Sequence, residues 1–276
     1  MRLARSGYAA VVAVQTPGLP EARIAELDQH GYVALPGFLA DDEVRALREH
    51  FSELLAECPT GDNSFVGYRT KRLHGVLGRT RAVDHLAAHP VVLAAAEHVV
   101  GQCLLSASVA IEIGPGEAAQ TPHFDDGIYP LPSDHGEVWV SAHWNLDPYT
   151  EANGGTVWYP GTNGDRGAAE HLPPGVNVEL PAGSLVIYVG TLWHNGGANR
   201  TDRPRLGLVF SYTSSWLRPQ ETQLLVVPPD VARGLNPELQ GLLGYAIRPP
   251  FLGYAFGKDP RELLEAETSS SAQGAR

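Results

Sequence analysis

The sequence predicts a mainly β fold with flanking helices, in which a β-sandwich or barrel forms the core. After Gly101 the chain consists of short β-branched and aromatic runs, separated by clusters of Gly, Pro, Asn and Asp. Many short strands at close intervals are typical of sandwiches and barrels. The first hundred residues instead carry apolar side chains at helical spacing. Strands and helices do not alternate along the chain, which argues against a parallel sheet.

Helices dominate the N-terminal portion, about 20–100. Apolar residues recur at helical spacing over 21–30 and 40–58, and Asp41 and Asp42 are placed to cap the second of these helices. A short strand and a turn are predicted between them, over 32–38. A further helix is predicted over 83–100, with a break at His89-Pro90 and its end at Gly101.

The β core is predicted over about 101–216. Its expected strands, each flanked by turn residues, are 104–113, 137–146, 155–159, 177–180, 184–189 and 205–213. Beyond Trp216 the chain is rich in proline, so 217–276 is expected to be irregular, with a disordered tail from Thr268. We expect residues 1–276 to form a single domain.

The composition is that of an acidic globular protein. The 276 residues are 43% hydrophobic and 18% charged, with a formal net charge of −11. Because acidic residues are spread along the chain, no basic stripe is available for phosphate backbones, and nucleic acid is not an expected partner. Ala, Gly, Pro and Arg are abundant while Lys71 and Lys258 are the only lysines, which points to a GC-rich bacterial genome.

Several features predict a cytoplasmic protein without a membrane partner. No window approaches the ~18 consecutive apolar residues of a membrane span. Cys58 and Cys103 lie in apolar contexts that suit a reducing compartment. The apolar run 8–14 is short for a secretory signal and has no clear cleavage site after it, so we expect a mobile leader or an added strand there.

Two histidines and an aspartate are the most informative residues of the chain. His123 and Asp125 have an H-x-D spacing, and His194 follows 71 residues after His123. On an extended strand, residues i and i+2 point to the same side, so His123 and Asp125 can hold one ion while Phe124 faces the other way. Two imidazoles and a carboxylate form the facial triad of non-haem Fe(II) sites. Taken alone, an H-x-D pair is also typical of a polar loop.

Arg205 adds a possible anion site to this triad. It stands eleven residues beyond His194 and opens the apolar run 206–210. An arginine at the mouth of a barrel strand can bind a carboxylate through two parallel hydrogen bonds, and so can anchor a diacid cosubstrate whose other end chelates a metal. The alternative is a surface ion pair.

Together these residues resemble the phytanoyl-CoA dioxygenase family, a branch of the Fe(II)- and 2-oxoglutarate-dependent oxygenases. The resemblance covers most of the chain and includes, in the same order, Asn153-Gly-Gly-Thr156, Tyr159-Pro-Gly-Thr162 and the run from His194 to Asn199. It implies a double-stranded β-helix core, which is a jelly-roll of cupin-like type. One departure is Asn163, which replaces a histidine of the usual family motif and concerns a loop beside the pocket.

The resemblance also implies roles for single residues. His123, Asp125 and His194 would bind Fe(II), and Arg205 would pair with the distal carboxylate of 2-oxoglutarate. Thr156 would support this cosubstrate through its hydroxyl. Gln120 is a second cosubstrate candidate, for which a role as a strand-edge polar residue is an equal alternative.

The expected reaction consumes O2 and 2-oxoglutarate, releases succinate and CO2, and abstracts hydrogen from a C–H bond of a small-molecule substrate. Related halogenases have a small residue at the position of Asp125, so we expect hydroxylation, cyclisation, epimerisation or desaturation instead. The segment 65–72 is expected to reach over the mouth of the barrel. The candidates for substrate contact are Tyr68, Arg72, Asp126, His143 and Trp193.

A small natural-product intermediate is the favoured substrate, and no oligomeric state is predicted. One alternative is an acyl-CoA hydroxylase of the same family, because a basic cluster between Arg69 and Arg81 could receive the phosphates of coenzyme A. Two others are a non-oxidative, metal-dependent isomerase of cupin type and a binding module without catalysis.

Overall fold

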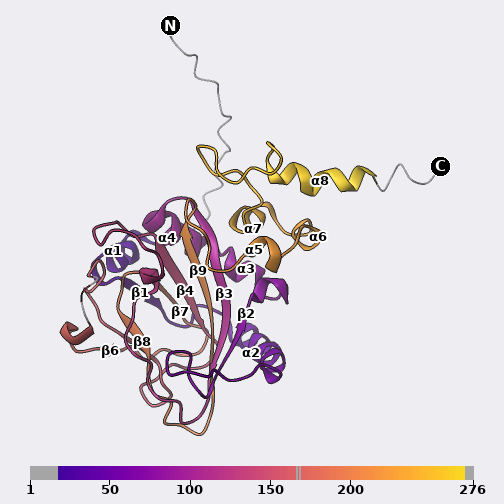
Figure 1. Cartoon of the computed structure of the whole chain (residues 1–276). Coiled ribbons are helices and arrows are strands. Elements are labelled where there is room, and N and C mark those ends of the chain that lie inside the picture. The colour runs from indigo at the N-terminus through magenta and orange to yellow at the C-terminus, as the bar shows by residue number, and fades with distance from the viewer. Residues whose placement is uncertain (1–17, 166, 168, 271–276) are drawn as a thin grey trace.

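The computed structural model describes residues 18–165, 167 and 169–270, which form two antiparallel sheets with helices around them (Figure 1). In the larger sheet the strand order is β1-β7-β4-β9-β3-β2, and in the smaller sheet it is β6-β5-β8. The larger sheet is built from β1 (Tyr32–Leu35), β2 (Thr70–His74), β3 (Cys103–Ile113), β4 (Trp139–Asn145), β7 (Leu185–Val189) and β9 (Arg205–Ser214). The smaller contains β5 (Thr156–Trp158), β6 (Val176–Asn177) and β8 (His194–Gly196). This confirms the predicted mainly β, jelly-roll fold class.

Most of the predicted strands are present, but two were missed and one is misplaced. β2 was missed because it carries Lys71 and Arg72, and the short polar β8 has no β-branched residue. The segment 65–72 is therefore a loop only as far as residue 69. The strand expected over 177–180 is shorter and begins earlier, at Val176.

The N-terminal helices are close to their predicted positions: α1 (Glu21–His30), α2 (Asp41–Ala56), α3 (Asp84–Ala87) and α4 (Pro90–Val100). The predicted break at His89-Pro90 is confirmed, because α4 begins with Pro90 at a position that proline tolerates. The capping prediction is wrong. Ala40 is the residue that precedes the second helix, so Asp41 and Asp42 lie in its first turn and favour its dipole instead.

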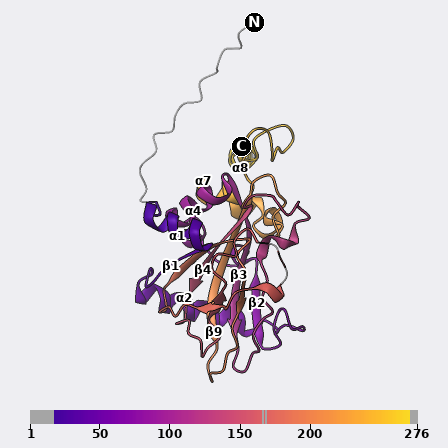
Figure 2. The ribbon, with the colours of Figure 1, turned by 90° about the vertical axis from the view of Figure 1, so that its left-hand side faces the viewer.

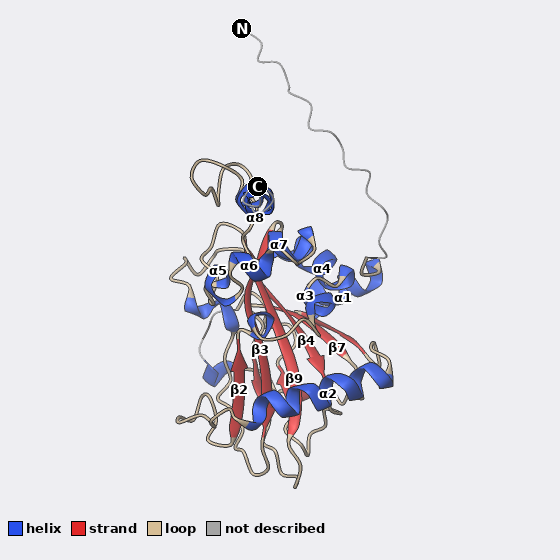
Figure 3. Cartoon of the chain, turned by 90° about the vertical axis from the view of Figure 1, so that its right-hand side faces the viewer, coloured by secondary structure: helices blue, strands red, loops and turns tan. Residues whose placement is uncertain are grey.

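Helix α2 lies across one face of the larger sheet (Figure 3). It buries Val44, Leu47, Phe51 and Leu55 at helical spacing, as its apolar pattern predicts. Short 3-10 helices occur at η1 (Val76–Gly78), η2 (Asp125–Ile128) and η3 (Ala169–His171). Among the described residues, none of the helices is long and apolar enough to cross a membrane.

The segment after Trp216 is more ordered than predicted. It forms α5 (Gln223–Val226), α6 (Pro229–Ala232), α7 (Pro237–Leu242) and α8 (Pro260–Ser270), which gather at one end of the larger sheet (Figures 1 and 2). The prolines that suggested irregular chain begin three of these helices, where the missing N–H costs nothing. Helix α8 extends past Thr268, whereas residues 271–276 and the N-terminal segment 8–14 lie outside the described residues.

Candidate metal centre and cosubstrate pocket

A cavity of about 440 Å³ lies between the two sheets. Alternate residues of a strand share one face, so the side chains that β2, β3, β4, β7 and β9 of the larger sheet turn toward the cavity come from one face of each strand. The smaller sheet closes the cavity with Thr156, Trp158 and His194. The side chains from the larger sheet include Arg72 and His74 (β2), Val109, Ile111 and Ile113 (β3), His143 (β4), Tyr188 (β7), and Arg205, Val209 and Ser211 (β9).

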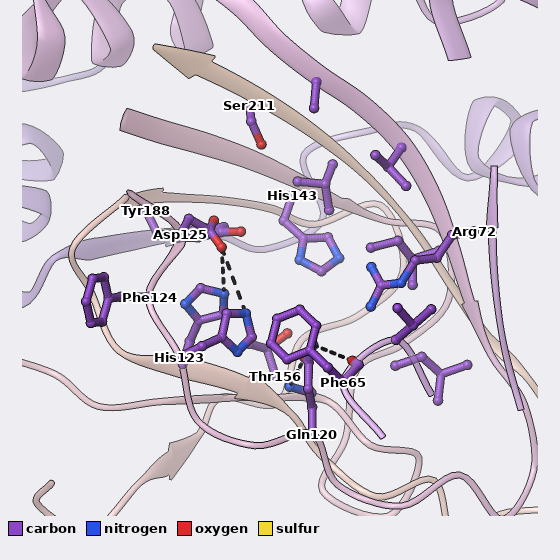
Figure 4. Close-up of a pocket in the computed structure, with 18 of the residues that line it drawn as sticks. Phe65, Arg72, Gln120, His123, Phe124, Asp125, His143, Thr156, Tyr188 and Ser211 are labelled. Carbon is purple, nitrogen blue, oxygen red and sulfur yellow. Dashed lines mark hydrogen bonds and ion pairs between the residues drawn. The ribbon is translucent and has the colours of Figure 1, made fainter. Parts of the chain in front are cut away.

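The structure brings His123, Asp125 and His194 together at this cavity (Figure 4). One potential ligand atom of each lies within 4.8 Å of those of the other two. Asp125 Oδ1 is 3.9 Å from His123 Nε2 and 3.7 Å from His194 Nε2. Among the described residues this is the one group of three or more such side chains with that spacing.

Backbone hydrogen bonds fix where these three residues stand. His123 and His194 form an isolated antiparallel bridge, and the N–H of Asp125 donates to the carbonyl of Gly190 at 2.8 Å. The expectation of an extended strand is correct for His123 and Phe124, but Asp125 begins the 3-10 helix η2. Phe124 does face away from the triad, and its ring packs edge-on against Trp193 at 4.9 Å.

The imidazoles are held in the form that suits a metal ligand. Nδ1 of His123 lies 3.0 Å from the carbonyl oxygen of Thr121, and Nδ1 of His194 lies 3.0 Å from that of Leu192. A carbonyl can only accept, so each Nδ1 carries a proton, and Nε2 is the ring atom left to bind a metal. Burial and the neighbouring His194 also lower the pKa of His123, which keeps it neutral. The donor set therefore fits Fe(II).

Side chains behind the triad hold Asp125 and His194 in place. The Ser141 hydroxyl donates to Asp125 Oδ2 at 3.4 Å, and burial together with the nearby charge of Asp125 raises the pKa of Tyr188. The rings of Tyr188 and Trp158 pack against His194 at 4.9 and 5.7 Å. The roles of Tyr188 and Ser141 were missed, because only the strand register shows that they face the triad.

Arg205 offers an anion site in the same cavity. It is 4% exposed, and its Nε has no hydrogen-bond partner among the described residues. Thr156 lines the cavity from β5. The Gln120 amide also lines it, accepting from Gly196 N at 3.3 Å and donating to the Phe65 carbonyl at 2.9 Å. A buried cation with a free donor favours a carboxylate ligand, so the residues present fit 2-oxoglutarate.

Two of the five candidates for substrate contact line the cavity. Arg72 and His143 point into it (Figure 4). Tyr68, Asp126 and Trp193 are not among its lining residues, and their contact with substrate stays a prediction. Tyr68 is 61% exposed, and Trp193 is buried with its indole N–H donating to the Asp165 carbonyl at 2.8 Å.

Asp126 lies within the 3-10 turn that begins at Asp125, and it is not among the residues that line the cavity. Its carboxylate is buried, and Oδ2 lies 3.7 Å from His135 Nε2. A contact of Asp126 with substrate stays a prediction from the sequence.

The fold and the site define a jelly-roll enzyme with a facial metal triad. A profile described as "Phytanoyl-CoA dioxygenase (PhyH)" matches residues 27–207, and the chain belongs to this family. Membership makes it an Fe(II)- and 2-oxoglutarate-dependent dioxygenase, which confirms the enzyme class and cofactors that the sequence predicts.

Named relatives agree with this assignment. Dioxygenase af480 of Aspergillus fumigatus is 30% identical over 86% of this chain and 82% of its own length. Dioxygenase FrzG of Cladobotryum sp is 28% identical over 84% and 87%. Both come from fungi, so they do not support the bacterial source predicted from composition.

Solved structures share the fold. The non-heme alpha ketoglutarate dependent epimerase SnoN from nogalamycin biosynthesis is 25% identical, with a TM-score of 0.62 over 72% of this chain and 85% of its own. HygX from Streptomyces hygroscopicus, solved with nickel and 2-oxoglutarate bound, is 16% identical with a TM-score of 0.60 over 73% and 89%, and shows the fold alone.

Proposed function

We propose that this enzyme oxidises a C–H bond of a small natural-product intermediate, with Fe(II) held by His123, Asp125 and His194. Arg205 and Thr156 bind 2-oxoglutarate. The observation that carries this proposal is the position of the triad and a buried, incompletely paired arginine on the walls of one cavity. The bound metal supplies O2 activation coupled to decarboxylation of the 2-oxo acid.

The two arginines of the cavity, Arg205 and Arg72, bind different anionic groups. Arg205 takes the distal carboxylate of 2-oxoglutarate, away from water. Arg72 is close enough to Asp125 for their charges to interact: burial lowers the pKa of Arg72, and Asp125 raises it. We therefore assign Arg72 to the anionic end of a molecule bound beside the metal. Gln120 joins the segment around Phe65 to β8 and closes this side of the site.

The remaining wall of the cavity favours an apolar substrate. Val109, Ile111, Ile113 and Val209 form an aliphatic surface from β3 and β9. A volume of about 440 Å³ is typical of sites for small molecules. The relative SnoN, an epimerase of nogalamycin biosynthesis, supports a natural-product substrate and a radical outcome other than hydroxylation as one option.

An acyl-CoA substrate is less well supported, because the basic cluster is already engaged. The Lys71 ammonium donates to the carbonyl of Leu55 at 3.0 Å, and Arg79 Nε donates to the carbonyl of His74 at 3.1 Å. Arg81 is paired with Asp84 at 3.4 Å. These groups would have to leave their partners to bind phosphates.

Turnover tests this function. Purified enzyme with Fe(II), 2-oxoglutarate and O2 is offered a panel of largely apolar natural products with and without a carboxylate, and succinate and product mass are measured. We expect succinate formation that rises with the true substrate and is lost in His194→Ala. A product that has gained one oxygen atom would identify hydroxylation. Loss of two hydrogens would identify desaturation or cyclisation, and an unchanged mass with succinate formation would identify epimerisation. Conversion of a substrate without O2 and without succinate would instead establish the non-oxidative isomerase.

We further propose that 1–276 acts as one oxygenase domain in the cytoplasm. Helices α5 and α7 pack on β3 of the core, which supports a single domain. Cys58 and Cys103 are both free thiols, which supports a reducing compartment. The bacterial source stays a prediction from composition.

A further inference from the structure

Three buried groups form a chain behind the cosubstrate cavity. The guanidinium carbon of Arg205 lies 3.9 Å from the centre of the Tyr149 ring, so the cation packs on the face of this ring. The Tyr149 hydroxyl lies 2.7 Å from Nε2 of His143, and the two rings meet edge-on at 5.1 Å. Tyr149 therefore contacts the cation through its ring face and connects it to His143 through its hydroxyl.

The hydrogen bond between Tyr149 and His143 has a defined direction. Burial and the nearby Arg205 lower the pKa of His143 to about 3, so the imidazole is neutral at physiological pH. The guanidinium of Arg205 has no acceptor atom, so it does not compete for the hydroxyl proton of Tyr149. This proton goes to Nε2 of His143. Each group uses the partner that its chemistry requires, and Arg205 keeps its Nε free for a ligand.

Gly207 makes room for this arrangement. It lies two residues after Arg205 on β9, and therefore on the same face of the strand. A Cβ atom at Gly207 would overlap the Tyr149 hydroxyl and would lie 2.7 Å from Nε2 of His143. The backbone of β9 is ordinary there, so the glycine is required by space and not by conformation.

We propose that Tyr149, held by His143 in the space left by Gly207, is a positioning residue that fixes Arg205 and so selects 2-oxo acids that carry a distal carboxylate. This inference rests on the proposed role of Arg205. A guanidinium stacked on an aromatic ring that is itself held in place has lost most of its freedom before the ligand arrives. A carboxylate at the right distance then gains the full interaction, whereas a ligand with an apolar end gains none of it.

Binding of two cosubstrates that differ only at the distal end tests this selection. 2-Oxoglutarate and 2-oxopentanoate are titrated anaerobically into the Fe(II) protein, and dissociation constants are obtained from the visible band of the chelate. Tyr149→Phe keeps the ring and removes the hydroxyl. We expect it to weaken 2-oxoglutarate binding about tenfold, or about 1.4 kcal/mol, while 2-oxopentanoate binding is unchanged. Gly207→Ala, which displaces the hydroxyl, is expected to act in the same direction.

A merely structural role would give a different pattern, in which both 2-oxo acids lose affinity together, and this would overturn the proposal. Unchanged binding of both would overturn it as well. Tyr245→Phe is the matched control, since this buried tyrosine donates to the Val227 carbonyl at 2.8 Å near the C-terminal helices. Arg205→Ala distinguishes an error in the proposed cosubstrate site from an error in the positioning role of Tyr149. If it leaves the preference for 2-oxoglutarate intact, the proposed cosubstrate site is wrong; if only Tyr149→Phe leaves it intact, the positioning role alone is wrong.

Discussion

Tyr188→Phe is expected to weaken the metal centre while leaving the fold intact. Tyr188 is 4% exposed, so burial raises its pKa, and it is close enough to Asp125 for the carboxylate to raise this pKa further. Residues that orient metal ligands typically contribute about 10- to 100-fold to metal affinity. The phenylalanine ring would keep the packing against His194, so only the contribution of the hydroxyl to Fe(II) affinity is lost. We therefore expect the lower end of that range, a rise of about tenfold in the dissociation constant for Fe(II), or about 1.4 kcal/mol.

Anaerobic competition between the protein and a coloured Fe(II) chelator measures this effect. Tyr212→Phe is a matched control, because Tyr212 is also fully buried and its hydroxyl donates to the Ala87 carbonyl at 2.6 Å. Tyr212 lies on the face of β9 opposite to the cavity-lining Ser211. The control is expected to lose about 1–3 kcal/mol of stability, since it leaves a buried acceptor unpaired, but to keep its iron affinity. Equal iron affinity in Tyr188→Phe and the wild-type protein would refute the reasoning.

Three further outcomes are expected. Phe51→Ala removes a fully buried ring from α2 and should lower the free energy of unfolding in urea by about 3–5 kcal/mol, whereas the exposed Phe251→Ala should have little effect; similar losses in both would contradict the packing described for α2. Burial raises the pKa of Glu221, but the neighbouring His74 and hydrogen bonds from the backbone N–H groups of Gly75 and Ser108 outweigh it and lower the pKa below its usual 4.5. The stabilisation by Glu221 is therefore present at neutral pH and lost as the pH falls below 4.5, so the stability difference between wild type and Glu221→Ala should shrink in acid, and a constant difference would count against it. Gln120→Ala frees the backbone around Phe65 and should speed proteolysis there, with cleavage at the wild-type rate as the contrary result.

The sequence could predict the metal ligands because their chemistry is rare and their spacing is local. Tyr149 and Tyr188 gave no such signal, since a buried tyrosine usually packs in the core. The register that places β4 between β7 and β9 brings Tyr188 to the cavity, and an isolated bridge to Leu180 holds Tyr149 in place. Asp126 and Arg72 also show that position in the sequence alone does not reveal which side chains reach the cavity. Asp126 adjoins a ligand in sequence, yet it is not among the residues that line the cavity, while Arg72 is brought in by a strand that its own charges conceal.

The helices and strands likewise divide into those that local sequence patterns predict and those that form through contacts with distant parts of the chain. Strands with β-branched residues and helices with an apolar stripe were predicted closely, because burial imposes those patterns on the sequence. Short polar strands such as β8 exist through their partners, and only the complete sheet shows them. Proline is compatible both with irregular chain and with the first turn of a helix. The sequence therefore did not show that three of the prolines after Trp216 begin helices.

The most direct test of the account is an anaerobic titration of the Fe(II) protein with 2-oxoglutarate, followed by visible absorption. We predict a chelate band that is absent in His194→Ala and that needs far more 2-oxoglutarate to form in Arg205→Ala. Iron binding without a band, or a band that forms equally well in the Arg205→Ala protein, would contradict the assignment of the triad and its neighbouring arginine.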